Sequence, residues 1–196
     1  MIIIKPAALL LATAYNAWHA IHTNGLDGLT GLANRSALNS AIDKWMDIFD
    51  TPIPSIEAIG FFDIDFFKQF NTDHGHHTGD MVLKHVAHII KREAKRLGGK
   101  AFRYGGEEFV ATFSKSMSHE EIDSIRKSVE DSICMFEWKE HKVRCSIGYS
   151  IKEHHADSES GKLLSTTLIR SANQALLLAK ETGRNRTTEW KRNSGD

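Results

Sequence analysis

Two consecutive glycines between two short apolar segments constrain the fold of this chain more than any other feature. Gly105-Gly106 separates a segment from Lys100 to Tyr104 from a segment from Glu108 to Phe113. A two-residue glycine link predicts a tight antiparallel hairpin, because the turns that suit such hairpins need positive φ angles, which glycine adopts without steric cost. The fold is therefore expected to contain an antiparallel pair of strands.

Helical and strand-like segments alternate on both sides of this hairpin. Apolar residues recur at helical spacing in some segments, whereas β-branched and aromatic residues dominate others. The expected helices run Ser36–Phe49, Phe66–Asn71, Thr78–Leu97, Ser118–Met135 and Ser165–Lys180, and the further strands run Ile56–Ile64, Val143–Ile151 and a short segment after Gly183. This pattern predicts an α/β (α+β) fold with a mostly antiparallel central sheet flanked by helices.

The length of 196 residues predicts one main domain, over 25–190, between a short leader over 1–24 and a polar tail over 191–196. Hydrophobic residues make up 41% and charged residues 26%, which excludes a disordered, collagen-like or polytopic membrane protein. The 25 basic and 25 acidic side chains cancel, so a basic sheath for nucleic acid is not expected. Cys134 and Cys145 form no spaced framework and are expected to be reduced core thiols.

The leader has two interpretations. Leu10, Ala14, Ala17 and Ile21 follow one another at spacings of four and three, which predicts a helix whose apolar seam pairs with a second copy of the chain. The alternative is a secretory signal that ends near residues 12–14. The uninterrupted apolar run is far shorter than the roughly 20 residues that a membrane-spanning helix needs.

Two aspartates end the most apolar strand-like segment. Asp63 and Asp65 flank Ile64 at the point where this segment finishes. One interpretation is a Mg²⁺ site, because this hard cation takes one or two carboxylates together with other oxygen ligands such as a backbone carbonyl and phosphates. The other interpretation is that both aspartates only end the strand and cap the helix that follows.

Acidic residues also follow the glycine pair directly, as Glu107 and Glu108. Glycines without side chains let a bulky anionic ligand approach the backbone closely. Two carboxylates beside such an anion site are chemically sensible if one of them holds a metal ion. The alternative is an ordinary hairpin whose acidic residues are solvated.

Four segments of the chain carry recognisable motifs. They are Asp27–Arg35 (D-x-L-T-G-L-x-N-R), Phe62–Lys68 with Asn71, Gly75-His76 and Gly79-Asp80, then Gly105–Phe109 (G-G-E-E-F), and Lys180–Asn185 (K-x-x-G-R-N). Together and in this order they resemble the motifs of the GGDEF-domain diguanylate cyclases, with the third segment in the GGEEF form of the signature. The resemblance covers nearly the whole chain. It implies a palm-like nucleotidyl cyclase fold.

The resemblance also implies a reaction, in which two GTP condense to cyclic di-GMP with loss of two pyrophosphates. Each domain would hold one GTP, so a homodimer is required to build the two-fold product. Two Mg²⁺ per active site, for which Mn²⁺ can substitute, would lower the pKa of the attacking hydroxyl and neutralise the leaving group. The resemblance therefore implies that GTP is the partner and that nucleic acid is not. It also implies a cytoplasmic location, and contact of the leader with a membrane stays open.

Individual positions match the functional positions of the family. They are Asp63, Ile64 (through its carbonyl) and Glu107 for the metal, Asp63, Glu107 and Glu108 for catalysis, Asn71 and Asp80 for guanine, and Lys68, Lys180 and Arg184 for the triphosphate. Adenine lacks the donors that a carboxylate accepts from guanine, so Asp80 disfavours ATP. Lys180 and Arg184 are four residues apart, and we expect them on one face of a helix end.

One departure from the family concerns regulation. The inhibitory product site of the family is an Arg-x-x-Asp ahead of the glycine pair, but here Arg96 is followed by Gly99 where the aspartate would stand. Strong product feedback through that site is therefore not expected. A catalytically weak module of the same fold that binds GTP or cyclic di-GMP is the alternative function, although the intact carboxylates favour the enzyme.

Histidines gather in the middle of the chain, where a transition-metal site is an alternative to local packing. They are His74, His76, His77, His85 and His88. The last two are expected one turn apart on a helix whose apolar face lies elsewhere, which favours the packing interpretation.

Overall fold

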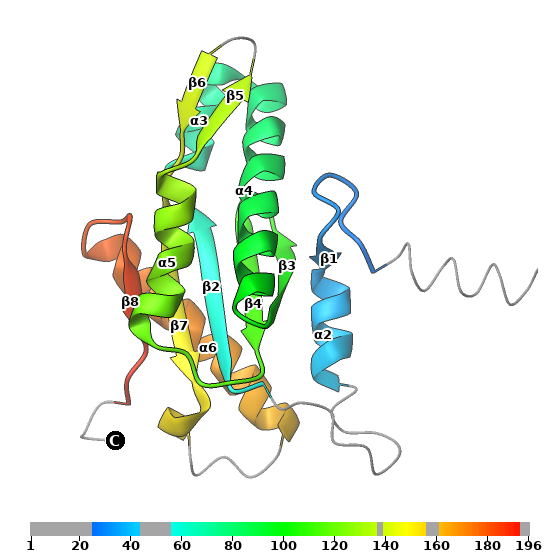
Figure 1. The fold of residues 1–196 in the computed structure, drawn as a ribbon, viewed down its shortest axis with the longest axis vertical. Coiled ribbons are helices and arrows are strands. Elements are labelled where there is room, and N and C mark those ends of the chain that lie inside the picture. The colour runs from blue at the N-terminus through cyan, green and yellow to red at the C-terminus, as the bar shows by residue number, and fades with distance from the viewer. Residues whose placement is uncertain (1–24, 44–55, 137–138, 156–160, 193–196) are drawn as a thin grey trace, which may run out of the picture.

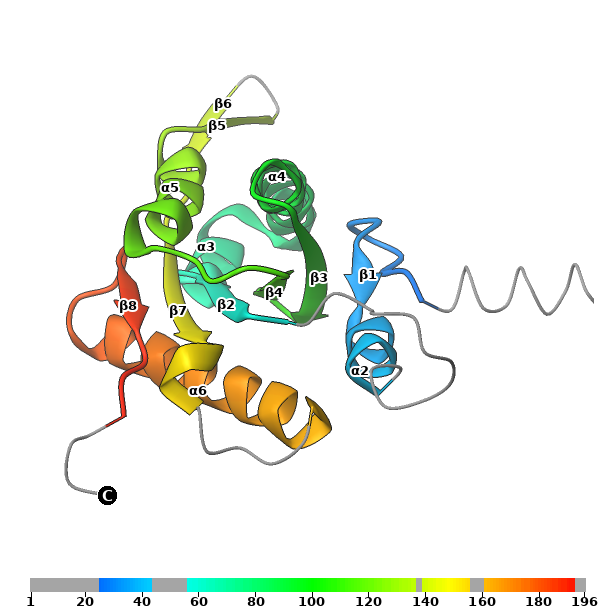
Figure 2. The same ribbon diagram turned by 60° about the horizontal axis from the view of Figure 1, so that its bottom comes forward.

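The computed structural model of the chain describes residues 25–43, 56–136, 139–155 and 161–192. Its centre is a six-stranded sheet with helices on both faces (Figures 1 and 2). The strands are β1 (Ala33–Asn34), β2 (Ala58–Ile64), β3 (Gly99–Gly105), β4 (Glu108–Phe113), β7 (Cys145–Ile151) and β8 (Thr187–Glu189). The helices are α2 (Arg35–Asp43), α3 (Phe67–His74), α4 (His76–Arg96), α5 (His119–Glu130) and α6 (Gly161–Glu181), with a 3₁₀ turn, η2 (Lys152–His155). A separate hairpin of β5 (Ile133–Phe136) and β6 (Lys139–Lys142) projects beyond one end of the sheet (Figure 1).

The strand order of the sheet is β1-β3-β4-β2-β7-β8. The three central pairings, β3 with β4, β4 with β2 and β2 with β7, are antiparallel, whereas β1 with β3 and β7 with β8 are parallel. The expected mostly antiparallel sheet flanked by helices is therefore confirmed. The strand expected after Gly183 is the edge strand β8.

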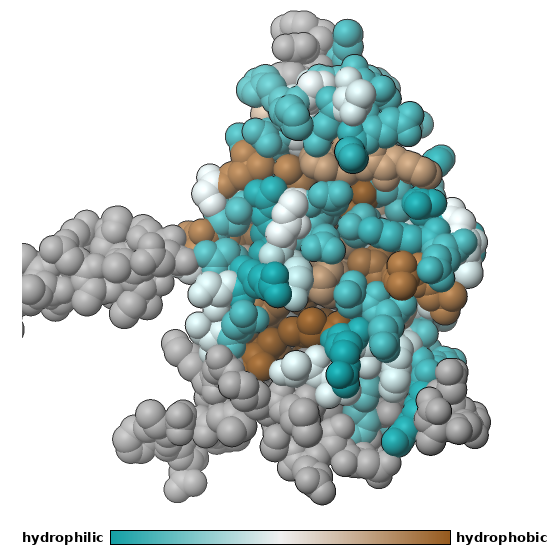
Figure 3. All heavy atoms as spheres, turned by 180° about the vertical axis from the view of Figure 1, so that it is seen from behind, coloured by the Kyte–Doolittle hydropathy of each residue, from teal (hydrophilic) through white to brown (hydrophobic). Residues whose placement is uncertain are grey.

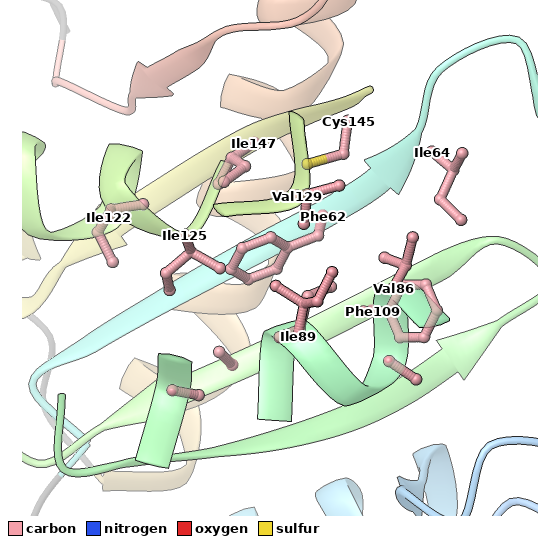
Figure 4. Close-up of a cluster of buried hydrophobic side chains, with 14 of the residues drawn as sticks. Phe62, Ile64, Val86, Ile89, Phe109, Ile122, Ile125, Val129, Cys145 and Ile147 are labelled. Atoms are coloured by element: carbon pink, nitrogen blue, oxygen red, sulfur yellow. The ribbon is translucent and has the colours of Figure 1, made fainter. Parts of the chain in front are cut away.

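The two faces of β2 pack against different layers of helices. Phe62 and Ile64 lie in the larger core with α4 and α5 (Figure 4), while Ile59 and Phe61 lie in a second core with α2 and α6. Because side chains alternate across a strand, Asp63 points to the same side as Phe61, toward α6. Burial on both faces also explains why β2 is apolar from Ala58 to Phe62 rather than at every second residue.

The described surface mixes polar and apolar side chains. From behind the view of Figure 1, apolar patches lie between polar ones (Figure 3). Leu177 and Leu178 on α6 and Ile133 and Met135 on β5 are among the exposed apolar side chains. Within the described ranges, no helix has both the length and the apolar character needed to cross a membrane. The expected seam of the leader and its secretory alternative lie outside these ranges, as does the part of the first expected helix beyond Asp43.

The helix expected from Ser118 to Met135 is wrong at its C-terminal end. Its start is as predicted, because Ser118 and Glu121 form a reciprocal capping box. The helix ends at Glu130, where the Ser132 hydroxyl donates to the Val129 carbonyl at 2.6 Å. The residues that follow alternate between exposed and buried positions in β5, so the apolar residues after Ser132 belong to a strand of period two. The hairpin of β5 and β6 was not predicted.

The turn of the glycine hairpin also differs from expectation. Gly105 is the last residue of β3 and pairs with Glu108, so the two residues of the turn are Gly106 and Glu107. Of the two glycines only Gly106 has a positive φ, of 48°. A register shift between Arg103 and Gly105 accounts for this displacement of the turn by one residue. The hairpin is therefore confirmed, but its two turn residues are Gly106 and Glu107 rather than the expected Gly105 and Gly106.

The close approach of β7 to α6 depends on Gly148. A Cβ atom at this position would overlap the backbone of α6 at Ala172, Ala175 and Leu176, where no flexible side chain is able to move away. We expect Gly148→Ala to lower the free energy of unfolding by about 3 kcal/mol, as for an overpacked core. Urea denaturation measures the loss. Gly28→Ala is the matched control, because a Cβ there meets nothing within 4 Å, and an equal loss in both variants would contradict the packing argument.

Candidate functional site

The acidic residues predicted from two separate motifs meet at the end of β2. The antiparallel register of β2 and β4 places Asp63 opposite Glu108. The backbone N–H of Ile64 donates to the carbonyl of Glu107 at 3.4 Å. The pairing of two strands thus brings Asp63, Ile64, Glu107 and Glu108 together, and we call this group the acidic corner.

Asp63 is the buried member of the acidic corner, with 5% of its surface exposed. Its Oδ2 lies 2.7 Å from the Nζ of Lys180, at the C-terminal end of α6. Burial raises the pKa of Asp63 to about 6; the Lys180 ammonium opposes this rise, and the charges of Glu107 and Glu108 add to it. The carboxylate is therefore in a position where a cation stabilises it strongly.

The glycine turn is held from the opening motif of the chain. The guanidinium of Arg103 donates to the carbonyl of Gly106 at 2.8 and 3.1 Å and to Asp27 Oδ1 at 2.9 Å. Asp27 also accepts from the backbone N–H and the hydroxyl of Thr30. Although burial acts to raise the pKa of Asp27, these hydrogen bonds and Arg103 lower it, so the residue is a fixed anion beside the hairpin.

Asp65 binds on the β7 side of β2, although it is only two residues beyond Asp63. Its Oδ1 accepts from the Ser146 hydroxyl at 2.7 Å and its Oδ2 from the backbone N–H of Asn185 at 2.9 Å. The two aspartates of the sequence motif therefore have different partners. Asp65 anchors the segment between α6 and β8.

The two residues expected to bind guanine lie on the neighbouring helices α3 and α4. The side-chain oxygen of Asn71 is buried and, within the described part of the chain, has no hydrogen-bond partner. It packs against Gly79, where a Cβ atom would overlap it, and Asp80 follows Gly79 directly in α4. A buried acceptor without a donor is uncommon in proteins and indicates a place where water or a ligand supplies one.

The three basic residues expected to bind the triphosphate lie in three different parts of the fold. Lys180 contacts Asp63, and Lys68 is exposed in the first turn of α3. Arg184 lies beyond the end of α6, and its guanidinium is 4.6 Å from the ring centre of Phe66. The expectation that Lys180 and Arg184 share a helix face is wrong, because Gly183 at φ 127° and Arg184 at φ 59° turn the chain out of the helix.

Phe66 and Gly79 were missed as residues that shape the site. Phe66 joins β2 to α3 with a left-handed φ of 58° and keeps 61% of its surface exposed. A left-handed φ is unusual for a bulky residue, and nothing in the sequence signals it. A glycine inside a helical pattern is a signal of close packing, and Gly79 carried that signal.

A cavity of about 790 Å³ lies against α3. Phe66, Phe70 and His74 of the α3 region line it together with the end of α5, the hairpin of β5 and β6, and Arg184. Of the residues considered for the site, Asp65 and Arg184 belong to its wall, whereas the residues of the acidic corner do not. The cavity is therefore separate from the acidic corner.

The two positions that correspond to the product site of the family, Arg96 and Gly99, are both taken up by contacts within the protein. The Nε of Arg96 is 2.7 Å from Glu93, and its Nη2 donates to Ser124 at 3.0 Å. At Gly99, a Cβ atom would lie 2.5 Å from the Phe113 ring and 2.6 Å from the Thr112 carbonyl. The position that departs from the family thus has no space for a longer side chain.

The histidines are dispersed. His85 pairs with the Ser132 hydroxyl at 2.9 Å, and burial, with the charges of His88 and Arg92, lowers its pKa. His74 packs against the rings of Phe70 and His141. In the part of the chain that the structure covers, no three side chains of His, Cys, Asp or Glu are arranged to hold a metal ion. Both cysteines are free and buried, as predicted.

Known proteins resemble this chain over most of its length. The family model described as "Diguanylate cyclase, GGDEF domain" matches residues 24–186. Diguanylate cyclase A of Treponema denticola is 35% identical over 196 aligned positions, which cover 97% of this chain and 51% of that protein. Diguanylate cyclase DosC of Escherichia coli K12 is 31% identical over 177 positions, which cover 87% of this chain and 36% of that protein. The chain thus spans about half the length of the first relative and about a third of the length of the second.

A solved structure agrees with the fold. The coiled coil and GGDEF domain of DgcB from Caulobacter crescentus, solved in complex with c-di-GMP, superimposes with a TM-score of 0.78 at 28% identity. The match covers 93% of this chain and 94% of that chain. With the family model matched over most of its residues, this chain belongs to the GGDEF-domain family of diguanylate cyclases.

Proposed function

We propose that this chain condenses two GTP into cyclic di-GMP and two pyrophosphates. The observation that carries the proposal is the acidic corner, where Asp63 is buried opposite Glu108, beside Glu107, and paired with the Lys180 ammonium. A buried carboxylate with acidic neighbours is costly unless a cation compensates it. Membership of the family and the names of the relatives support the same reaction.

Asp63, the Ile64 carbonyl and Glu107 would hold Mg²⁺ in this proposal. The donors fit, because Mg²⁺ prefers oxygen ligands and takes only one or two carboxylates while phosphates and waters complete its sphere. The ion pair between the Lys180 ammonium and Asp63 supports the fit, because it shows that the carboxylate already binds one cation in this place. Two such ions, or Mn²⁺ in their place, would lower the pKa of the attacking hydroxyl and neutralise the leaving pyrophosphate. Glu108 has an accessory role at the reacting hydroxyl or the metal.

The guanine base would lie between α3 and α4. Asn71 offers a buried oxygen without a donor, and Asp80 is the next residue after the glycine that packs on Asn71. Guanine carries N1–H and amino donors, whereas adenine would leave these acceptors unpaired. This pair of side chains therefore supports GTP over ATP as the substrate.

The basic residues serve the triphosphate. In the reaction, the 3′-oxygen of one GTP forms a bond to the α-phosphorus of the other, the hydroxyl loses its proton, and the bond from the α-phosphorus to the pyrophosphate oxygen breaks. Negative charge then grows on the leaving pyrophosphate. Lys68, Lys180 and Arg184 would stabilise that charge, which is the main contribution a protein makes to phosphoryl transfer.

Turnover would require two copies of the domain, since the product is a two-fold ring and each copy holds one GTP. The apolar spacing of Leu10, Ala14, Ala17 and Ile21 is the proposed means of pairing. A structure that this chain resembles, that of DgcB from Caulobacter crescentus, is described as a coiled coil and GGDEF domain, which supports the proposal of a pairing segment.

A receptor for cyclic di-GMP is the less favoured function. The expected product site has its arginine paired with Glu93 and has no space for a side chain at Gly99. Strong product inhibition through that site is disfavoured for the same reason.

The metal assignment predicts the effect of Glu107→Ala. With GTP and Mg²⁺, the rate of cyclic di-GMP formation, measured by chromatography and mass spectrometry, should fall by about 100-fold or more, because a metal ligand is lost. Glu140→Ala on β6 is the matched control and should keep the rate. Retained turnover in Glu107→Ala would exclude the metal role, and a wild-type chain that makes no cyclic di-GMP even as a dimerising fusion would exclude the cyclase.

The unpaired oxygen of Asn71 predicts that affinity and stability separate in Asn71→Ala. The Michaelis constant for GTP should rise about 10-fold or more, because an acceptor for guanine is lost. The free energy of unfolding without nucleotide should change by less than about 1 kcal/mol, since removal of an unpaired buried acceptor offsets the lost packing. Steady-state kinetics and urea denaturation measure the two effects, and a large loss of stability with an unchanged Michaelis constant would contradict the assignment.

A further inference from the structure

The segment between α6 and β8 is held in a backbone conformation that needs external support. Arg184 and Asn185 both have left-handed φ angles, of 59° and 46°. Such angles are unfavourable for a residue other than glycine unless surrounding contacts fix them. Arg184 is one of the three basic residues proposed to bind the triphosphate, so whatever fixes this segment also fixes the backbone from which its side chain extends.

Asn185 is the anchor of this segment, and it is bound through both backbone and side chain. Its backbone N–H donates to Asp65 Oδ2 at 2.9 Å and to the Ser146 hydroxyl at 3.1 Å. Its side-chain amide donates to Glu130 Oε1 at 2.7 Å. Its side-chain oxygen accepts from Arg126 Nη1 at 3.0 Å. These bonds reach three parts of the fold: the end of β2 through Asp65, strand β7 through Ser146, and helix α5 through Arg126 and Glu130.

Arg126 links this anchor to α5, which lies beside β8 (Figure 1). It is 8% exposed and is paired with Asp123 at 2.7 Å and with Glu130 at 2.6 Å. Asp123 in turn accepts from the hydroxyl of Thr187, the first residue of β8, at 2.8 Å. The network therefore holds the chain within the left-handed pair, at Asn185, and directly after it, at Thr187.

The same network reaches the partner of Arg184 in the site. Asp65, which accepts from Asn185, is followed directly by Phe66, and the Arg184 guanidinium lies over the Phe66 ring at 4.6 Å. Phe66 also has a left-handed φ. The hydrogen bonds from Arg126 through Asn185 to Asp65 thus connect the two residues whose side chains meet, although Arg126 is separated in sequence from both.

We propose that Asn185 and Arg126 are positioning residues that set where the Arg184 guanidinium meets the triphosphate. This inference rests on the proposed function, in which Arg184 binds phosphate. A small displacement of a charged group from its productive position is costly in catalysis, because the field at the developing charge falls with distance. The residues act through Arg184 and have no contact with substrate.

The test is a double-mutant cycle between Asn185→Ala and Arg184→Ala. Asn185→Ala removes both side-chain hydrogen bonds and leaves the backbone bond to Asp65. On its own it should lower kcat/KM for cyclic di-GMP formation about 10-fold to 100-fold, with more effect on kcat than on KM, because the charge grows in the transition state. In the Arg184→Ala background it should have almost no further effect on kcat/KM.

The controls separate positioning from stability. Arg144→Ala removes a longer ion pair to Glu130, at 3.5 Å, from an exposed arginine without touching Asn185, and it should keep wild-type kinetics. Arg126→Lys keeps the charge but not the fork of donors, and it should repeat the loss of Asn185→Ala. Urea denaturation of the four proteins of the cycle measures the free energy of unfolding. If Asn185 acted only on the fold, the losses of stability in the two single variants would add in the double variant.

The outcomes are distinct. Additive losses in kcat/KM, or wild-type kinetics in Asn185→Ala, would overturn the positioning role while the cyclase stands. If the wild-type chain binds a non-hydrolysable GTP analogue but makes no cyclic di-GMP, the proposed reaction fails, and the same cycle in calorimetric Kd values decides the positioning role. If the wild-type chain binds no GTP analogue, both proposals are overturned.

Discussion

The antiparallel pairing of β2 with β4 is the interaction on which the rest of the candidate site depends. It places Asp63 opposite Glu108 and joins Ile64 to the carbonyl of Glu107. Packing enforces this register, because a shift of one residue would exchange the side chains between the core of α4 and α5 and the core of α2 and α6. The geometry of the acidic corner is therefore a consequence of how two apolar cores divide the residues of one strand.

Charges at the end of this strand organise the surrounding segments. Asp63 is buried and draws the end of α6 to the acidic corner through Lys180. Asp65 binds the backbone of Asn185 and so holds the segment that carries Arg184. Burying a carboxylate is unfavourable unless it is paired or hydrogen-bonded, so each aspartate fixes the part of the chain that satisfies it. Two aspartates separated by one residue thereby orient two different basic residues.

The sequence predicted the segments whose periodicity is reinforced by burial and was wrong where local patterns are ambiguous. The extended apolar run of β2 and the helical spacing within α4 were recognised, because each packs against a defined core. The residues after Ser132 continued the apolar character of α5, although they form a strand of a separate hairpin. The glycine hairpin was recognised, but its turn is displaced by one residue, because a register shift in β3 is a property of the paired strands.

The motifs by themselves determined which residue types are present: carboxylates at the end of an apolar strand, glycines at a turn, and basic residues near the C-terminus. Only the tertiary structure decided which of them meet. It separated Asp63 from Asp65, placed Lys180 and Arg184 on different paths, and connected Arg126 to the segment that carries Arg184. The physical reason is that these arrangements depend on strand register, on the partner that satisfies each buried charge and on left-handed backbone angles. Each of these is set by contacts between segments that are distant in sequence.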